Sequence, residues 1–159
     1  MAKPRMVRVL PRGNWLDDSG AEVQPAVPDF LKLGQTKDGR ANRMDLADWI
    51  VSRDNPLTAR VIVNRLWQHH LGRGIVNTPN DFGLQGELPT HPQLLDWLAS
   101  ELIQNGWRLK SLHKQIVMSA AYCQSAAHDA AKLTADPQNK LHWRRTPARL
   151  EAEVIRDSI

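Results

Sequence analysis

The chain has 159 residues, of which 42% are apolar and 24% are charged, as in an ordinary globular domain. Its single cysteine excludes an internal disulfide bond and a Cys-x-x-Cys-His haem attachment, and no apolar run is long enough for a membrane-spanning helix. The net charge of +4 permits a polyanionic partner without requiring one.

Residues 1–41 show no sustained hydrophobic period, so we expect an irregular, extended segment that packs on the rest of the chain. Val7 and Val9 alternate around Arg8 and predict at most one short strand. Prolines and glycines interrupt the remainder: Pro4, Pro11, Gly13, Gly20, Pro25, Pro28, Gly34 and Gly39. No apolar stretch follows Met1–Arg5, and a secretory signal is therefore not expected in this chain.

A helical period begins at Asn42, whose side chain can cap a helix over Arg43–Ser52. That helix would turn three apolar side chains to one side: Leu46, Trp49 and Ile50. Asn55 and Pro56 then have the signature of a second helix start, a capping amide followed by a proline.

The second helix has the clearest apolar stripe in the sequence. Its members recur at helical steps: Ala59, Ile62, Val63, Leu66, Trp67 and His70. Burial of each large apolar side chain contributes roughly 1.5–3 kcal/mol before conformational entropy is subtracted. Gly72 is expected to end the helix in the left-handed conformation.

The segment Gly74–Pro89 is a long connection with little periodicity, and connections of this length tend to be functional or disordered. Phe82 and Leu84 indicate that it is held against the body of the protein. Thr90 and Gln93 then form the pattern of a capping box.

Two or three further helices are predicted after the capping box. The first ends at Gly106 and turns Leu95, Leu98, Ala99 and Leu102 inward; the second runs from Lys110 to Tyr122. Residues 123–140 are expected to be a surface connection. Thr146 and Pro147 predict the start of a last helix, which has no stop signal before Ile159.

These elements predict a mainly α fold, an orthogonal bundle of four to five helices with an irregular, extended N-terminal segment. We expect two regions, an N-terminal segment over residues 1–41 and a helical domain over residues 42–159 that is truncated at its C-terminal end.

Four polar residues on the second helix are candidate ligand-binding groups. Arg65 and His69 lie one turn apart on one flank, and Asn64 and Gln68 are expected on the outward face. A ladder of this kind can bind a ligand, but anchoring of the Gly74–Pro89 connection is favoured. His69 and His70 diverge by about 100° and lack the spacing of a metal-binding pair, so no metal site is predicted.

Asp81, Glu87 and His91 are the candidate catalytic residues. Two carboxylates and an imidazole suffice for general acid–base chemistry if they converge on one pocket. The alternative is that the connection uses its polar residues to form turns.

Basic residues near the C-terminal end form the third group of candidates. Arg144, Arg145 and Arg149 surround Trp143, a mixture that can stack on nucleic acid. Pairing of Arg149 and Arg156 with Glu153 at helical spacing on the last helix is favoured, so nucleic-acid binding is not expected.

The six tryptophans divide into two groups. Trp49, Trp67 and Trp97 lie on or beside apolar helix faces and are expected in the core. Trp15, Trp107 and Trp143 lie in connections or at helix edges, where a flat ring can stack on a sugar, although packing is favoured for them too.

Several strings in order along the chain resemble the domain of unknown function 1553, which occurs in large planctomycete proteins. The strings are Arg12–Asn14, Val27-Pro28, Asp54–Arg60, Val63–Val76, Asp81–Gly83, Gly86-Glu87, His91–Leu98 and Arg149–Asp157. The resemblance implies a longer, exported, multidomain protein, in which a separate domain of the cytochrome type can bind haem c. It implies no cofactor in this chain and no catalytic residue.

We therefore expect a structural or interaction module of an exported protein, with other domains of the same polypeptide, carbohydrate or a redox partner as its ligand. The alternatives are a hydrolase of an extracellular polymer, with Arg65 as substrate clamp, and a nucleic-acid-binding domain. No insertion into a membrane is expected.

Overall fold

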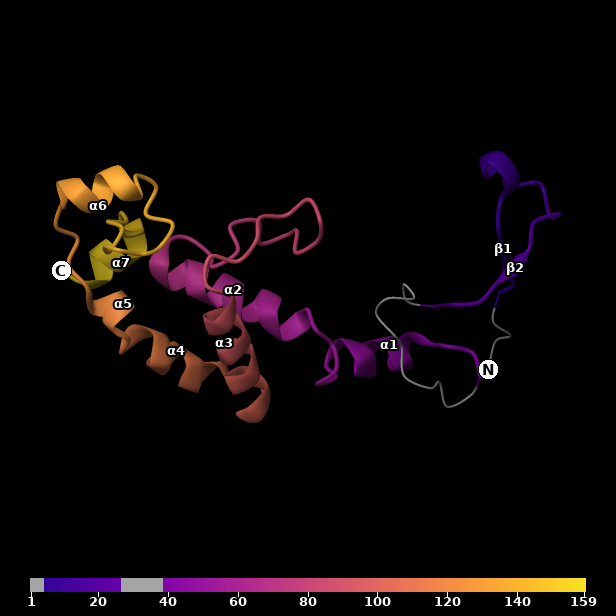
Figure 1. Cartoon of the computed structure of the whole chain (residues 1–159). Coiled ribbons are helices and arrows are strands. Elements are labelled where there is room, and N and C mark those ends of the chain that lie inside the picture. Colours follow the sequence, from indigo (N-terminus) through magenta and orange to yellow (C-terminus); the bar gives the residue numbers. More distant parts are fainter. Residues whose placement is uncertain (1–4, 27–38) are drawn as a thin grey trace. The chain divides into compact units, whose positions relative to one another are not determined.

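The computed structural model describes residues 5–26 and 39–159 (Figure 1). The chain divides into two compact units, Met1–Asn55 and Pro56–Ile159. The described residues hold seven helices and a single two-stranded sheet, which confirms the mainly α prediction. The orthogonal arrangement, the boundary between residues 41 and 42 and the packing of the N-terminal segment on the body stay predictions. The breakers Pro4, Pro28 and Gly34, and the string Val27-Pro28, lie outside the described residues.

The N-terminal unit begins with a small antiparallel hairpin. Strand β1 (Val7–Arg8) pairs with β2 (Glu22–Val23), so that Val7 lies opposite Val23. Between them the 3₁₀ turn η1 (Pro11–Gly13) holds Arg12 in the left-handed region at φ 52°. The predicted short strand therefore exists. Its partner β2 was not predicted, because two residues are too few to show an alternating hydrophobic pattern.

Helix α1 (Arg43–Ile50) begins where the sequence predicted. The Asn42 side chain accepts the N–H groups of Met44 and Asp45, and the Asp45 carboxylate accepts the Asn42 N–H at 2.8 Å. This reciprocal pair is a capping box, which satisfies donors that the first helical turn leaves free. Its apolar side is not buried: Leu46 is 44% and Ile50 40% exposed.

Helices α2 (Thr58–Leu71) and α3 (Pro92–Gln104) form the centre of the second unit. Helix α2 begins two residues after the predicted proline and ends at Gly72, whose φ of 81° confirms the predicted left-handed exit. The capping box predicted for α3 is wrong. His91 is its N-cap, and the Thr90 hydroxyl donates instead to the Ile75 carbonyl at 3.2 Å.

The remaining helices are shorter than predicted. The helix expected over residues 110–122 is two helices, α4 (Leu109–Val117) and α5 (Ala120–Cys123), because the Ser119 side chain caps a new start. The expected surface connection contains α6 (Ala130–Ala135), which Asp129 caps. Helix α7 (Ala152–Asp157) has Glu151 as its N-cap, so the start predicted at Thr146 is wrong.

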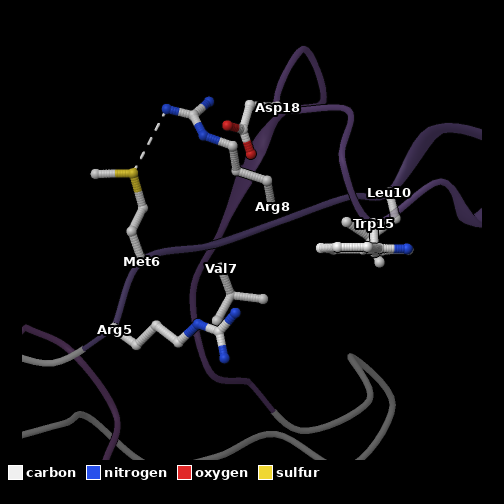
Figure 2. Close-up of a pocket in the computed structure, with 7 residues that line it drawn as sticks. All are labelled: Arg5, Met6, Val7, Arg8, Leu10, Trp15 and Asp18. Atoms are coloured by element: carbon white, nitrogen blue, oxygen red, sulfur yellow. Dashed lines mark hydrogen bonds between the residues drawn. The ribbon is translucent and has the colours of Figure 1, made fainter.

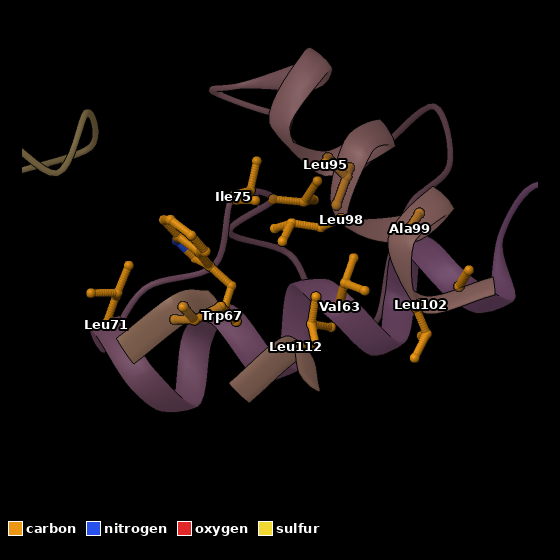
Figure 3. Packing of buried hydrophobic residues seen from close by; sticks show 12 residues of the cluster. Val63, Trp67, Leu71, Ile75, Leu95, Leu98, Ala99, Leu102 and Leu112 are labelled. Carbon is orange, nitrogen blue, oxygen red and sulfur yellow. The ribbon is translucent and has the colours of Figure 1, made fainter. Parts of the chain in front are cut away.

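Residues 74–91 join α2 to α3, and we call them the 74–91 connection. The core lies where α2, α3 and α4 meet the start of this connection (Figure 3). Helix α2 contributes a row at intervals of four residues, and α3 faces it with the apolar positions that the sequence predicted. The buried apolar residues are Ala59, Val63, Trp67, Leu71, Ile75, Val76, Leu95, Leu98, Ala99, Leu102, Leu112 and Ile116. Trp67 is therefore a core residue as predicted, whereas Trp97 is 50% exposed and the prediction for it is wrong.

Among the described residues, no helix combines the length and the apolar character that crossing a membrane requires.

Candidate functional site

The 74–91 connection is fixed to α2 by a buried asparagine. The Asn64 side chain is fully buried; its amide donates to the Val76 carbonyl at 2.9 Å, and its Oδ1 accepts the Val76 N–H at 2.8 Å. The expectation that Asn64 faces outward is therefore wrong. The connection crosses this side of α2 and covers Asn64, which would otherwise face solvent. The Asn64 amide then satisfies the buried N–H and carbonyl groups of Val76.

The other end of the connection is fixed to the residue that precedes Val76. The Thr90 N–H donates to the Ile75 carbonyl at 2.9 Å, so the two ends of the connection meet there. Between the two ends, Arg65 of α2 donates to the Asn80 side chain at 2.9 Å. Asn64 and Arg65 thus anchor the connection, the interpretation favoured from the sequence.

The three candidate acid–base residues each contact a different partner. The Asp81 carboxylate accepts the Gly83 N–H at 2.8 Å and shapes a turn. The Glu87 carboxylate accepts the Asn77 amide at 3.1 Å and lies 3.6 Å from the guanidinium of Arg73.

His91 lies at the other end of the connection, where its Nδ1 is 3.0 Å from the Thr90 hydroxyl. The contacts thus tie Asp81 to a turn, Glu87 to an arginine and His91 to a threonine. A catalytic role for this set stays a prediction.

Two histidine contacts that the sequence did not predict flank the C-terminal half of α2. In the first, the Trp67 indole N–H donates to Nε2 of the buried His142 at 3.2 Å. The ring of His91 lies beside it, with 6.2 Å between ring centroids. Burial lowers the pKa of His142, and the nearby His91 and Arg73 lower it further, while Asp136 acts in the opposite direction.

The second contact joins α2 to α4. Nε2 of His70 lies 2.7 Å from Nδ1 of His113, and the His70 ring lies nearly perpendicular to the ring of Tyr122 of α5, with 5.9 Å between their centroids. Arg145 completes the group, because its guanidinium donates to the His70 carbonyl at 2.8 Å and lies 4.1 Å from the centre of the Tyr122 ring. Burial, together with the neighbouring His113, Arg145 and His69, lowers the pKa of His70.

These histidine contacts could not be predicted from spacing. His142 is 75 residues from Trp67, and His113 is 43 residues from His70. The one available signal was the position of His70 within the apolar stripe, which favours a partner from another element.

The basic candidates near the C-terminal end do not act as one group. Arg145 is engaged with α2 and α5, as described above, and Arg144 lies over the ring of Trp143 at 5.1 Å. Arg149 is exposed and precedes α7, so it lies outside the helix on which it was expected to pair. Gln68 is half-buried and His69 exposed on α2.

A hollow of about 680 Å³ lies beside the hairpin of the N-terminal unit (Figure 2). We call it the Trp15 hollow, and it is lined by Arg5, Met6, Val7, Arg8, Leu10, Trp15 and Asp18. The Trp15 indole is 76% exposed, and the Arg8 guanidinium is held by the Gly20 carbonyl at 3.2 Å and the Met6 sulfur at 3.5 Å. The hollow thus offers a flat aromatic ring, aliphatic side chains and fixed charge together.

A second hollow, of about 480 Å³, lies in the helical unit between α2, the 74–91 connection and α3. Its lining includes Val76, Phe82 and Leu95, together with Arg60 and Asp96, which form an ion pair at 2.7 Å. Across residues 5–26 and 39–159, no three side chains of histidine, cysteine, aspartate or glutamate come together as ligands of a metal ion would.

A family model with the description protein of unknown function (DUF1553) matches residues 42–159. The matched range contains every candidate site residue except the lining of the Trp15 hollow. No curated protein and no solved structure matches the chain.

Proposed function

We propose that this chain, which belongs to the DUF1553 family because the family model covers most of its length, is an interaction module that docks another folded domain. The proposal rests on one observation about the N-terminal unit: its described residues through Asp54 include none that is buried, yet they display large apolar side chains.

The exposed side chains are those that protein interfaces use. The Trp15 hollow combines tryptophan, methionine and arginine, the residue types enriched in the buried centres of interfaces. Met6 is 57% and Leu16 70% exposed close by in the sequence. Aliphatic side chains of this kind gain free energy when a partner removes them from water.

The partner that we propose is another domain of the same polypeptide. A hollow with so few apolar residues gives an interface well below the roughly 1,000 Å² that a stable complex of separate proteins needs. A domain tethered to the chain has an effective concentration on the order of millimolar, at which such a weak contact still forms. The resemblance to exported multidomain proteins supports the further proposal that this contact forms in the cell envelope.

Hydroxyl-radical footprinting tests the proposal. We expect Trp15 and Met6 to be oxidised several times more slowly in the complete polypeptide than in the isolated 159-residue chain, since docking removes them from water. Trp97 is the matched control, because it is half-exposed on α3 and lies outside the hollow. Equal oxidation of Trp15 in both proteins contradicts the proposal.

Carbohydrate is the second candidate ligand for the same hollow. An indole that is 76% exposed can stack on the apolar face of a sugar, and the guanidinium of Arg8 and the carboxylate of Asp18 are suited to hydroxyl groups. Retention on insoluble polysaccharides that is lost in Trp15→Ala and kept in Trp97→Ala favours this reading. If both variants bind as well as the native chain, the hollow is not the sugar site.

A further inference from the structure

Two side chains join the segment over residues 124–145 to helix α2, those of His142 and Arg145. His142 bonds to Trp67 of α2, and Arg145 bonds to the carbonyl of His70, about one turn further along the same helix. The Gln124 amide donates to the His142 carbonyl at 2.6 Å, which ties the start of the segment to the same point. One of these contacts therefore depends directly on the charge state of His142, and the other lies at His70, whose ring has a histidine partner of its own.

The contact between Trp67 and His142 tolerates no additional proton. The indole nitrogen is only a donor, so Nε2 of His142 must accept and its single proton lies on Nδ1. A second proton on the ring would place two donors 3.2 Å apart and end the hydrogen bond. It would also place a cation next to His91 and Arg73, in a site that is only 8% exposed.

The contact between His70 and His113 tolerates one additional proton and no more. At 2.7 Å, one of the two facing nitrogens must donate and the other must accept. When both rings are charged, both nitrogens carry protons and the contact breaks. A charged His70 would then lie close to Arg145 as well as to His113, three cations around one helix end.

Other charged groups facing these sites act in both directions. Asp136 favours the charged form of His142, but its carboxylate is already bonded to the N–H groups of Lys140 and Leu141, at 2.9 and 2.8 Å. Tyr122 presents its ring to His70 and to Arg145. Burial and the surrounding cations prevail at both histidines, whose neutral forms the folded chain favours.

We propose that the pairs His70–His113 and His91–His142 form an acid-sensitive latch. Near neutral pH the latch holds residues 124–145 on α2, and protonation releases that segment and uncovers Trp67. Release leaves the packing of α2 against α3 in place, because the side chains buried between these helices are apolar. The latch therefore acts on one face of the helical unit and is independent of the Trp15 hollow.

Footprinting at two pH values tests the latch. Trp67 is 5% exposed in the latched chain, and we expect its oxidation to rise ~10-fold between about pH 7.5 and about pH 5, the range in which histidine titrates. Trp15 and Trp97 are already exposed and should change little, which controls for the effect of pH on the radical chemistry. Circular dichroism at both pH values should show that the helices persist.

Two substitutions separate the latch from a general loss of stability at low pH. His142→Gln keeps an acceptor for the Trp67 N–H, and His113→Asn keeps a partner for His70, yet neither new side chain can be charged. The double variant should therefore lose the rise in Trp67 oxidation. His128→Gln is the matched control, since His128 is exposed and belongs to neither pair, and it should keep the rise.

The proposal is overturned if Trp67 of the native chain stays protected at about pH 5, or if the double variant shows the same rise as the native chain. Should the double variant not fold, proton resonances of the histidine rings in the native chain decide the matter. The latch requires His142 to titrate with the same midpoint as the exposure of Trp67. Titration of His142 without any change at Trp67 excludes the latch.

Discussion

Asn64 is the residue whose replacement tests the construction of the helical unit most directly. Asn64→Ala removes the donor to the Val76 carbonyl and the acceptor of the Val76 N–H, while both backbone groups remain buried. Each unpaired buried group costs about 1–3 kcal/mol, and partial relaxation of the connection makes a total loss of about 3 kcal/mol reasonable. A unit of this size should then melt roughly 10–20 °C lower.

Urea denaturation of the native chain, Asn64→Ala and Gln68→Ala measures this loss. Gln68 lies one turn further along α2 and is half-buried, so its truncation should change the free energy of unfolding by less than about 0.5 kcal/mol. Asn64→Asp should be destabilising near neutral pH, because a carboxylate would face the Val76 carbonyl; it should recover in part in acid, where the protonated carboxyl can again donate. Equal losses for Asn64→Ala and Gln68→Ala would refute the reasoning.

Three further predictions concern the same unit. Gly74→Ala should lower the free energy of unfolding by about 1–3 kcal/mol, because the new Cβ would meet a backbone oxygen at 2.5 Å; a thermal melt that matches the native chain would contradict this. Arg145→Lys should lower the free energy of unfolding, measured in urea, by about 1 kcal/mol, because an ammonium group cannot both stack on Tyr122 and reach the carbonyl of His70. An unchanged free energy of unfolding would argue against a stabilising role for these contacts. The pKa values of His70 and His142 are lowered in the folded chain, so the unfolded chain binds more protons as the pH falls. The free energy of unfolding should therefore be highest above about pH 6.5 and should decrease below it. A urea midpoint that is the same at acidic and neutral pH would exclude this linkage.

The apolar pattern predicted the centre of the fold because helical spacing acts locally. The stripe on α2 and the inward positions of α3 reappear in the core, and Asn42 and Gly72 bound their helices as their chemistry requires. Where such signals are absent, the helix ends were predicted at the wrong residues. Thr90 has a hydroxyl that could cap a helix, but this hydroxyl donates its hydrogen bond to the Ile75 carbonyl instead. The sequence around Thr90 contains no information about Ile75, which is 15 residues away.

The same reason explains what could be predicted of the candidate sites. Asn64 has the spacing of a solvent-facing residue, and it becomes interior only because a distant part of the chain crosses it. The partners of His70 and His142 come from other elements, so the identity of each histidine was visible and its function was not. The Trp15 hollow was predicted only to the extent that Trp15 was named as a ring that can stack on a ligand.

The way the 74–91 connection is tied at its base has a practical consequence for engineering. Its two ends are held together by Asn64 and Thr90, whereas Leu84 at the tip is fully exposed. Lengthening a closed turn costs only about 0.6 kcal/mol for each doubling of its length. Foreign sequence, such as an epitope or a fluorescent label, can therefore be grafted beside Leu84 while the helices below keep their native geometry.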